Sequence, residues 1–126
     1  MILICGIPNA GKTTYSSRYD NVIHFDEVLG RDRRDKVVEA VKQDNSVVVE
    51  GVYGKASERK RLAEASEDHN TCIFLDTPLE KCEERERIGR TRSTRLVRWA
   101  HEDFETPTFD EGWDTIITIK EKSWTK

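Results

Sequence analysis

The chain has 126 residues, enough for one domain with its own core, and we expect that domain to span residues 1–120, followed by a polar tail at 121–126. Charged residues make up 36% of the sequence, yet the formal net charge is −3, which argues against nucleic-acid binding through overall charge and requires any attraction to phosphates to be local. Three cysteines without metal-ligand spacing, the lack of any apolar stretch near about 18 residues, and an apolar run directly after Met1 indicate a cytoplasmic protein without a membrane span.

The first predicted strand, residues 2–5, leads into a complete phosphate-binding loop, the P-loop. Gly6-Ile7-Pro8-Asn9-Ala10-Gly11-Lys12-Thr13 matches the pattern G-x-x-x-x-G-K-[ST], and residues 13–19 are compatible with a helix. A strand, a glycine-rich turn and a helix N-terminus direct backbone N–H groups at one point, where phosphates can bind. We therefore predict a nucleoside triphosphate site, with Lys12 at the β- and γ-phosphates and the Thr13 hydroxyl on Mg²⁺. The predicted nucleotide contacts are Gly6, Pro8, Asn9, Ala10, Gly11, Lys12, Thr13 and Thr14.

The second apolar run, residues 22–25, is predicted to be a strand that ends at Asp26. In open α/β sheets the functional groups lie at the carboxyl ends of the strands. A carboxylate there would face the γ-phosphate and could accept the proton of an attacking hydroxyl, so Asp26 is the candidate general base. Its structural alternative is to act as N-cap of the next helix, which the spacing of apolar residues predicts over 33–43.

Two further predicted strands also end in an acid. The strand over residues 47–49 is followed by Glu50, and the strand over 72–75 by Asp76. An acid after a hydrophobic strand is typical of the magnesium-linked carboxylate of P-loop enzymes. We prefer Glu50 for a place near the metal or the phosphoryl acceptor, with Asp76 as the competing candidate. Either acid can instead cap a helix, and one helix is predicted between these strands, over 56–67.

An arginine-rich stretch follows on two predicted helices, over residues 79–88 and 93–103. Thr77 is the predicted N-cap of the first of these helices and Pro78 its first residue. The break at 88–91 predicts a short mobile lid at about 86–93. The stretch contains Arg85, Arg87, Arg90, Arg92, Arg95 and Arg98. Because guanidinium groups bind phosphate oxygens, we expect one or two of them to be catalytic, whereas the others can pair with the neighbouring Glu80, Glu83, Glu84 and Glu86 on a solvated face.

The last predicted strand, residues 116–119, completes an alternation of five strands with about five helices. This alternation predicts a parallel sheet covered by helices on both faces. With the P-loop after the first strand, the prediction is an α/β P-loop kinase fold of three α/β/α layers, with a five-stranded, mostly parallel sheet and an arginine-rich lid. Trp99 and Trp113 are expected to pack on the core or its edge, and Trp124 of the polar tail could do the same.

Four segments carry a family resemblance. They are Gly6–Thr14, with its proline near the first glycine; Asp26 with Leu29-Gly30; Cys82–Arg87; and His101–Trp113, which contains F-E-x-P-x-x-x-E-G-W. In this order, from 1 to about 120, they resemble the polynucleotide kinase family, P-loop enzymes that phosphorylate 5′-hydroxyl ends of DNA or RNA. Forms related to the last segment occur in other small kinases, including those acting on aminoacylated transfer RNA.

The resemblance implies transfer of the γ-phosphoryl group of ATP, with Mg²⁺, to a 5′-hydroxyl end of nucleic acid. Asp26 would orient and deprotonate that hydroxyl, Lys12 would stabilise the phosphates, and Arg85 would act on the transferring group, with Arg87 as a further nucleotide contact. No phosphatase domain accompanies the kinase segments, so a separate ligase or phosphatase would be the partner in an end-repair pathway.

The acceptor contacts depart from the family pattern. Family members often have an arginine about three residues after the base, where this chain has Leu29, so that Arg31 or Arg34 would have to take its place. Glu50 is followed by Gly51-Val52-Tyr53 where the family tends to have an Asp-x-Thr-Asn-like turn. With Asp26, the predicted acceptor contacts are therefore Arg31, Arg34 and Glu50.

Two other functions remain open from the sequence. A kinase of a small metabolite, a nucleoside or a sugar would share every P-loop argument and differ only in its acceptor, and the low net charge favours it. A nucleotide-binding switch without a phosphoryl acceptor is the third alternative, although the sequence has no N-K-x-D motif for guanine recognition.

Overall fold

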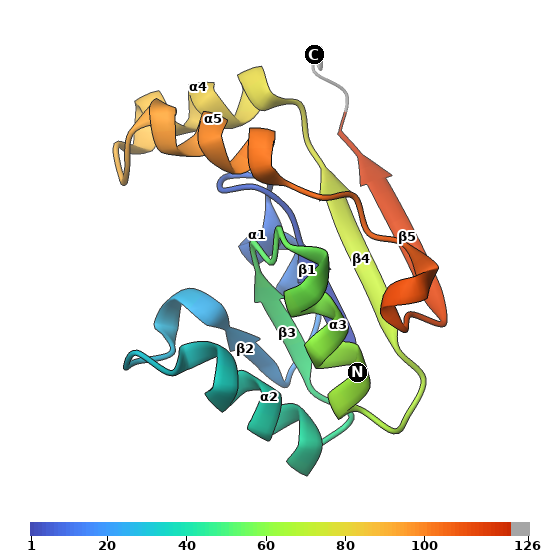
Figure 1. Ribbon diagram of the computed structural model, residues 1–126. Helices are drawn as coiled ribbons and strands as arrows, with labels where there is room; N and C mark the ends of the chain where they lie inside the picture. The colour runs from blue at the N-terminus through green and yellow to red at the C-terminus, as the bar shows by residue number, and fades with distance from the viewer. Residues whose placement is uncertain (122–126) are drawn as a thin grey trace.

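The computed structural model describes residues 1–121 and has a central sheet of five parallel strands in the order β2-β3-β1-β4-β5 (Figure 1). The strands are β1 Ile2–Cys5, β2 Val22–His24, β3 Val48–Gly51, β4 Thr71–Asp76 and β5 Thr115–Lys120. Every neighbouring pair is parallel, which confirms the predicted α/β class and its parallel sheet. Trp124 lies outside the described residues.

Within residues 1–121, five α-helices and two short 3₁₀ turns connect the strands. They are α1 Lys12–Ser16, η1 Phe25–Glu27, α2 Arg33–Gln43, α3 Ala56–Ala65, α4 Leu79–Gly89, α5 Thr94–Asp103 and η2 Phe109–Glu111. None of the helices in this part of the chain is long and apolar enough to cross a membrane. The predicted helix over 56–67 ends two residues earlier, at Ala65, and the predicted eight-residue lid is reduced to the connection 90–93, because 86–89 complete α4.

The sheet is covered on both faces, as the predicted three-layer architecture requires. Successive side chains of a strand point to opposite faces. On one face, Leu3 packs in a cluster with Val41 of α2 and Leu62 of α3. On the other face, Ile4 packs in a second cluster with Cys82 of α4 and Val97 of α5. Each cluster therefore binds two helices to the sheet.

The register of the strands brings the predicted functional segments together at the carboxyl end of the sheet. Ile4 lies opposite Glu50 and Cys5 opposite Gly51, so β3 ends beside the strand that enters the P-loop. His24 at the end of β2 also lies opposite Glu50. Because parallel strands end at the same edge, Asp26, Glu50 and the P-loop share one side of the sheet.

The start of α4 differs from its predicted cap. The helix begins at Leu79, after Pro78, whose carbonyl accepts from the backbone N–H groups of Lys81 and Cys82. Thr77 does not cap this helix; its hydroxyl donates to the carbonyl of Ala10, 2.8 Å away. The residue thus holds the P-loop against the end of β4.

Candidate phosphate and acceptor site

The P-loop turns from β1 into α1 through backbone conformations that its residues permit. A Cβ at Gly6 would lie 2.9 Å from the carbonyl oxygen of Leu75, so only glycine allows this close approach to β4. Gly11 has φ +102°, in the left-handed region that favours glycine. Asn9 has φ 69°, which asparagine tolerates better than most residues. These positions shape the loop before any ligand binds.

Lys12 is buried at the base of the loop. Its side chain has 8% relative exposure and its Nζ donates to the carbonyl of Ile7 at 2.8 Å. Burial lowers the pKa of Lys12 below its ordinary value, and the nearby Glu50 and Asp26 carboxylates oppose that shift. Both acids are therefore close enough to act electrostatically on the P-loop lysine.

A cavity of about 980 Å³ lies over the P-loop and extends to the neighbouring strand ends. It is lined by the P-loop residues Pro8 to Thr14 and by Asp26 and Glu50, and also by Arg85 and Arg92. Of the predicted nucleotide contacts in the loop, Gly6 alone does not line it, since it is buried against β4. The structure thus places the predicted phosphate site and the two predicted acceptor carboxylates around one cavity.

The two cavity carboxylates have different environments. Asp26 is exposed on the η1 turn directly after β2. Glu50 is 6% exposed, and its Oε1 lies 2.6 Å from Nδ1 of His24. Asp76, the competitor of Glu50 from the sequence, is not among the described residues that line the cavity. Of the two acids that the sequence offered for this position, Glu50 is the one that lines the cavity.

The predicted arginines divide into two groups. Arg85 lines the cavity, and its guanidinium donates to the carbonyl of Asn9 at 2.7 Å and to Glu121 at 2.6 Å. Arg92 also lines it, although sequence reasoning did not select Arg92 over its neighbours.

The other three predicted arginines are placed elsewhere. Arg87 and Arg31 are exposed and, within residues 1–121, neither lines the cavity. Arg34 pairs with Glu58 at 2.6 Å and lies over the ring of Phe25, 4.9 Å from its centroid, which keeps it off the cavity wall. The structure therefore does not bring the predicted contacts Arg31, Arg34 and Arg87 to the site.

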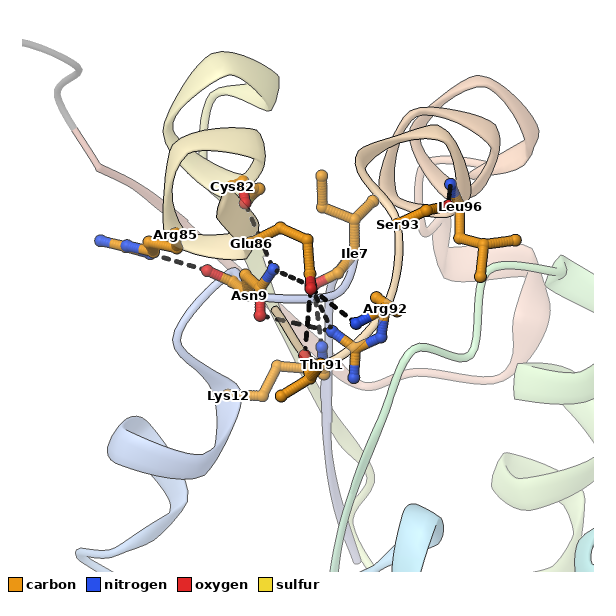
Figure 2. Close-up of polar contacts among 10 residues, drawn as sticks. All are labelled: Ile7, Asn9, Lys12, Cys82, Arg85, Glu86, Thr91, Arg92, Ser93 and Leu96. Carbon is orange, nitrogen blue, oxygen red and sulfur yellow. Dashed lines mark hydrogen bonds and ion pairs between the residues drawn. The ribbon is translucent and has the colours of Figure 1, made fainter. Parts of the chain in front are cut away.

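Glu86 is a site residue that the sequence did not reveal. Its side chain is buried on α4 and accepts hydrogen bonds from Asn9 of the P-loop and from the 91–92 segment, as Figure 2 shows. From the sequence, Glu86 was one of four glutamates expected to pair with arginines on a solvated face. Glu83 is also buried and pairs with Arg98 of α5, so neither acid faces solvent.

An arginine–tyrosine pair that the sequence did not predict also lines the cavity. Arg18 and Tyr15 both line it, and the Arg18 guanidinium lies 3.8 Å from the centroid of the Tyr15 ring. A cation at this distance interacts favourably with the π-face. Tyr15 lies on α1, whereas Arg18 follows the end of that helix at Ser16, so helix periodicity does not predict the pair.

The donor set suits a metal that arrives with a nucleotide. In the described part of the chain, no three His, Cys, Asp or Glu side chains form a ready metal cluster. Mg²⁺ in phosphoryl-transfer sites is held by one or two protein groups together with phosphates and waters. The Thr13 hydroxyl and the Glu50 carboxylate, both at the cavity wall, provide such groups.

Solved structures of similar fold include several kinases. A gluconokinase from Sinorhizobium meliloti 1021 is similar with a TM-score of 0.67 at 20% identity, covering 94% of this chain and 81% of the other. A sugar kinase from Janibacter sp. HTCC2649 has a TM-score of 0.70 at 15% identity, covering 94% and 83%. A shikimate kinase from Acinetobacter baumannii, in complex with shikimate, has a TM-score of 0.62 at 18% identity, covering 98% and 84%. No protein-family model and no curated protein matches the chain by sequence. At these identities the likeness establishes the P-loop kinase fold.

Proposed function

We propose that the chain is an ATP-dependent kinase that transfers the γ-phosphoryl group to a hydroxyl of a small molecule. The observation that carries the proposal is the common cavity of Lys12, Asp26 and Glu50. It combines a phosphate-binding loop with carboxylates at the neighbouring strand ends, where an acceptor hydroxyl would lie. Phosphoryl transfer depends mainly on such positioning and on electrostatic stabilisation.

Each cavity residue has a role in this proposal. Asp26 orients the acceptor hydroxyl and takes its proton, as an exposed carboxylate with no competing ion pair among the described residues can do. Lys12 neutralises charge on the phosphates, and so do Arg85 and Arg92, which line the same cavity. Bound ATP with Mg²⁺ would supply the phosphoryl group, and the Thr13 hydroxyl and the Glu50 carboxylate would hold the metal.

The acceptor side of the cavity supports a small hydroxyl compound. Asp26 and Glu50 place two carboxylates on this side of the cavity. Nδ1 of His24 is engaged by Glu50, so it is not available to bind an anionic acceptor. Carboxylates accept hydrogen bonds from alcohols but repel phosphate groups. Structures of similar fold include a gluconokinase, a sugar kinase and a shikimate kinase, which agrees with an acceptor of this class.

The direct test is transfer of γ-labelled phosphate from ATP. The acceptors would be sugars, sugar acids, other cyclic alcohols and nucleosides, with a short 5′-hydroxyl oligonucleotide in parallel. Lys12→Ala and Asp26→Asn serve as inactive controls. Label on a small acceptor that both variants lose supports the proposal. ATP binding without transfer to any hydroxyl would instead indicate a nucleotide-binding switch.

A polynucleotide 5′-hydroxyl acceptor is the second candidate, favoured by one surface. Arg90 and Arg95 are exposed, and Arg95 lies 6.0 Å from the ring centroid of Trp99, which is 52% exposed. Basic groups beside an exposed aromatic ring suit a single strand, in which phosphates bind cations and bases stack. The family resemblance of the F-E-x-P-x-x-x-E-G-W stretch points the same way.

Salt dependence separates the two acceptors. Binding of a single strand should weaken by about 0.7 log units per phosphate contact for each tenfold rise in salt. A small neutral acceptor should bind almost independently of salt. A salt-insensitive oligonucleotide KM, or label found only on small acceptors, would contradict the polynucleotide candidate.

A further inference from the structure

Glu86 is the centre of a hydrogen-bond cluster that joins the P-loop to the connection between α4 and α5 (Figure 2). Its carboxylate accepts from the Asn9 side-chain amide at 3.0 Å and from the Thr91 hydroxyl at 3.2 Å. It also accepts from the Arg92 backbone N–H at 2.6 Å and lies 3.3 Å from the Arg92 guanidinium. Every one of these partners is a donor, so the site requires the ionised carboxylate.

Both ends of the cluster reach the cavity. Asn9 and Arg92 line it, and Arg92 Nη1 also lies 3.4 Å from Asn9 Oδ1. The Asn9 side-chain amide also donates to the carbonyl of Cys82 at 3.2 Å, and Arg85 donates to the backbone carbonyl of Asn9. Glu86 itself does not line the cavity and its side chain is 1% exposed. Any influence on the phosphates therefore passes through its partners.

We propose that Glu86 is a positioning residue that holds the Arg92 guanidinium and the Asn9 corner of the P-loop in one arrangement, so that the terminal phosphate meets a preformed site. The inference rests on the proposed kinase function and adds to it the group that sets the arginine in place. Free arginine side chains sample many rotamers, and fixing one beforehand removes that cost from ligand binding. Hydrogen bonds from Arg92 and Asn9 lower the pKa of Glu86, which keeps the anchor charged.

The chain provides a matched control one helical turn away. Glu83 is also buried on α4 and also pairs with an arginine, since Arg98 donates to it at 2.8 and 3.0 Å. In the part of the chain that the structure describes, neither Glu83 nor Arg98 lines the P-loop cavity. Loss of the Glu83 pair should therefore affect the packing of α4 on α5 without affecting the phosphates.

The test measures binding of Mg-ATP and Mg-ADP by calorimetry, which requires no knowledge of the acceptor. The variants are Glu86→Gln, Arg92→Ala, the double variant and Glu83→Gln. In Glu86→Gln, an amide NH₂ group replaces one carboxylate oxygen and faces side chains that also donate hydrogen bonds. The hydrogen bonds that hold Arg92 are therefore lost. We expect Glu86→Gln and Arg92→Ala each to weaken ATP binding about tenfold more than ADP binding, and the double variant to lose less than the product of the two single losses. Glu83→Gln should leave the ATP-to-ADP ratio unchanged.

Two results would overturn the proposal. One is an equal loss of ATP and ADP affinity in Glu86→Gln. The other is a loss of ATP affinity from Glu86→Gln that is as large in the Arg92→Ala background as in the wild-type protein. If Glu86→Gln does not fold, Glu86→Asp keeps the charge but moves it by one methylene, and the same selective loss is expected. If the wild-type protein binds both nucleotides but transfers phosphate to no hydroxyl, the kinase function is overturned. The ratio of ATP to ADP affinity in the variants would still decide the role of Glu86.

Discussion

Arg59 of α3 and Glu111 of η2 form a buried, bidentate ion pair, in which Nε lies 2.8 Å from Oε1 and Nη2 lies 2.9 Å from Oε2. Arg59 also donates to the carbonyl of Tyr53, and Glu111 accepts from the indole N–H of Trp113. The pair therefore joins the segment after β3 to the F-E-x-P-x-x-x-E-G-W stretch. Through the buried Glu111 and Trp113, the stretch that resembles a family motif in sequence has a structural role here.

Removing one partner of this pair should strongly destabilise the fold. Glu111→Gln would leave the buried Arg59 guanidinium without its counter-charge, which typically costs about 3–5 kcal/mol. Urea unfolding followed by circular dichroism measures this loss. Glu58→Gln removes the partly exposed pair with Arg34 and should cost less than about 1 kcal/mol. Equal losses in the two variants would contradict the structural role of the Arg59–Glu111 pair.

The same pair predicts a contribution to acid sensitivity. Burial raises the pKa of Glu111, but the hydrogen bonds from Arg59 and Trp113 outweigh it, so the pKa lies below the ordinary value of 4.5. A lowered folded-state pKa stabilises the protein above the unfolded pKa, and this stability is lost as pH falls through the folded pKa. The free-energy difference between wild type and Glu111→Gln should therefore be largest near neutral pH and shrink below about pH 4.5. A difference that is constant with pH would contradict this assignment.

Asp26→Asn should lower turnover while ATP binding remains. An amide cannot accept the proton of the acceptor hydroxyl, and loss of a general base costs about 10²–10⁴-fold in rate. Glu27→Gln is the matched control, since Glu27 is also exposed on η1 but is not among the described residues that line the cavity. Steady-state kinetics with the identified acceptor measures both. Equal activity of the two variants would remove Asp26 from the mechanism.

Lys12→Ala should lower transfer by about 10²–10³-fold, because it removes a fixed positive charge at the phosphates. The loss should appear in ATP affinity as well as in turnover, since Lys12 lies at the base of the P-loop rather than at the acceptor. Calorimetric titration with Mg-ATP separates the two effects. Unchanged ATP affinity would mean that the nucleotide binds elsewhere.

The arginines on α4 and the connection after it should differ in their effects. Arg85→Ala and Arg92→Ala should lower turnover, because both guanidiniums line the cavity and removal of such a group costs up to about 10³–10⁵-fold in phosphoryl transfer. Arg87→Ala tests the sequence prediction against the structure. The exposed Arg87 should be dispensable if its observed position holds in the working enzyme. A severe loss in Arg87→Ala would show that the connection between the helices rearranges on binding.

The sequence predicted the parallel sheet and the P-loop well because both depend on neighbouring residues. Strand and helix patterns repeat over a few positions, so the predicted 33–43 helix matches α2, Arg33–Gln43. The predicted strand over 47–49 matches β3 only in part, since β3 is Val48–Gly51 and contains Glu50, and the sequence preferred Glu50 to Asp76 without resolving that choice. That choice depends on which strand pairs with β1 on which side, and local pattern does not contain strand order.

The amino-acid sequence by itself determined the position of the P-loop, because the motif is complete within the eight residues Gly6 to Thr13, with glycine where the backbone requires it. Only the tertiary structure decided which distant side chains meet that loop. Glu86 contacts Asn9 across 77 positions, and Glu50 contacts His24 across 26. These pairs form because packing of α4 and the order of the strands bring them together, and the charge pattern of α4 did not distinguish its buried acids from its solvated ones.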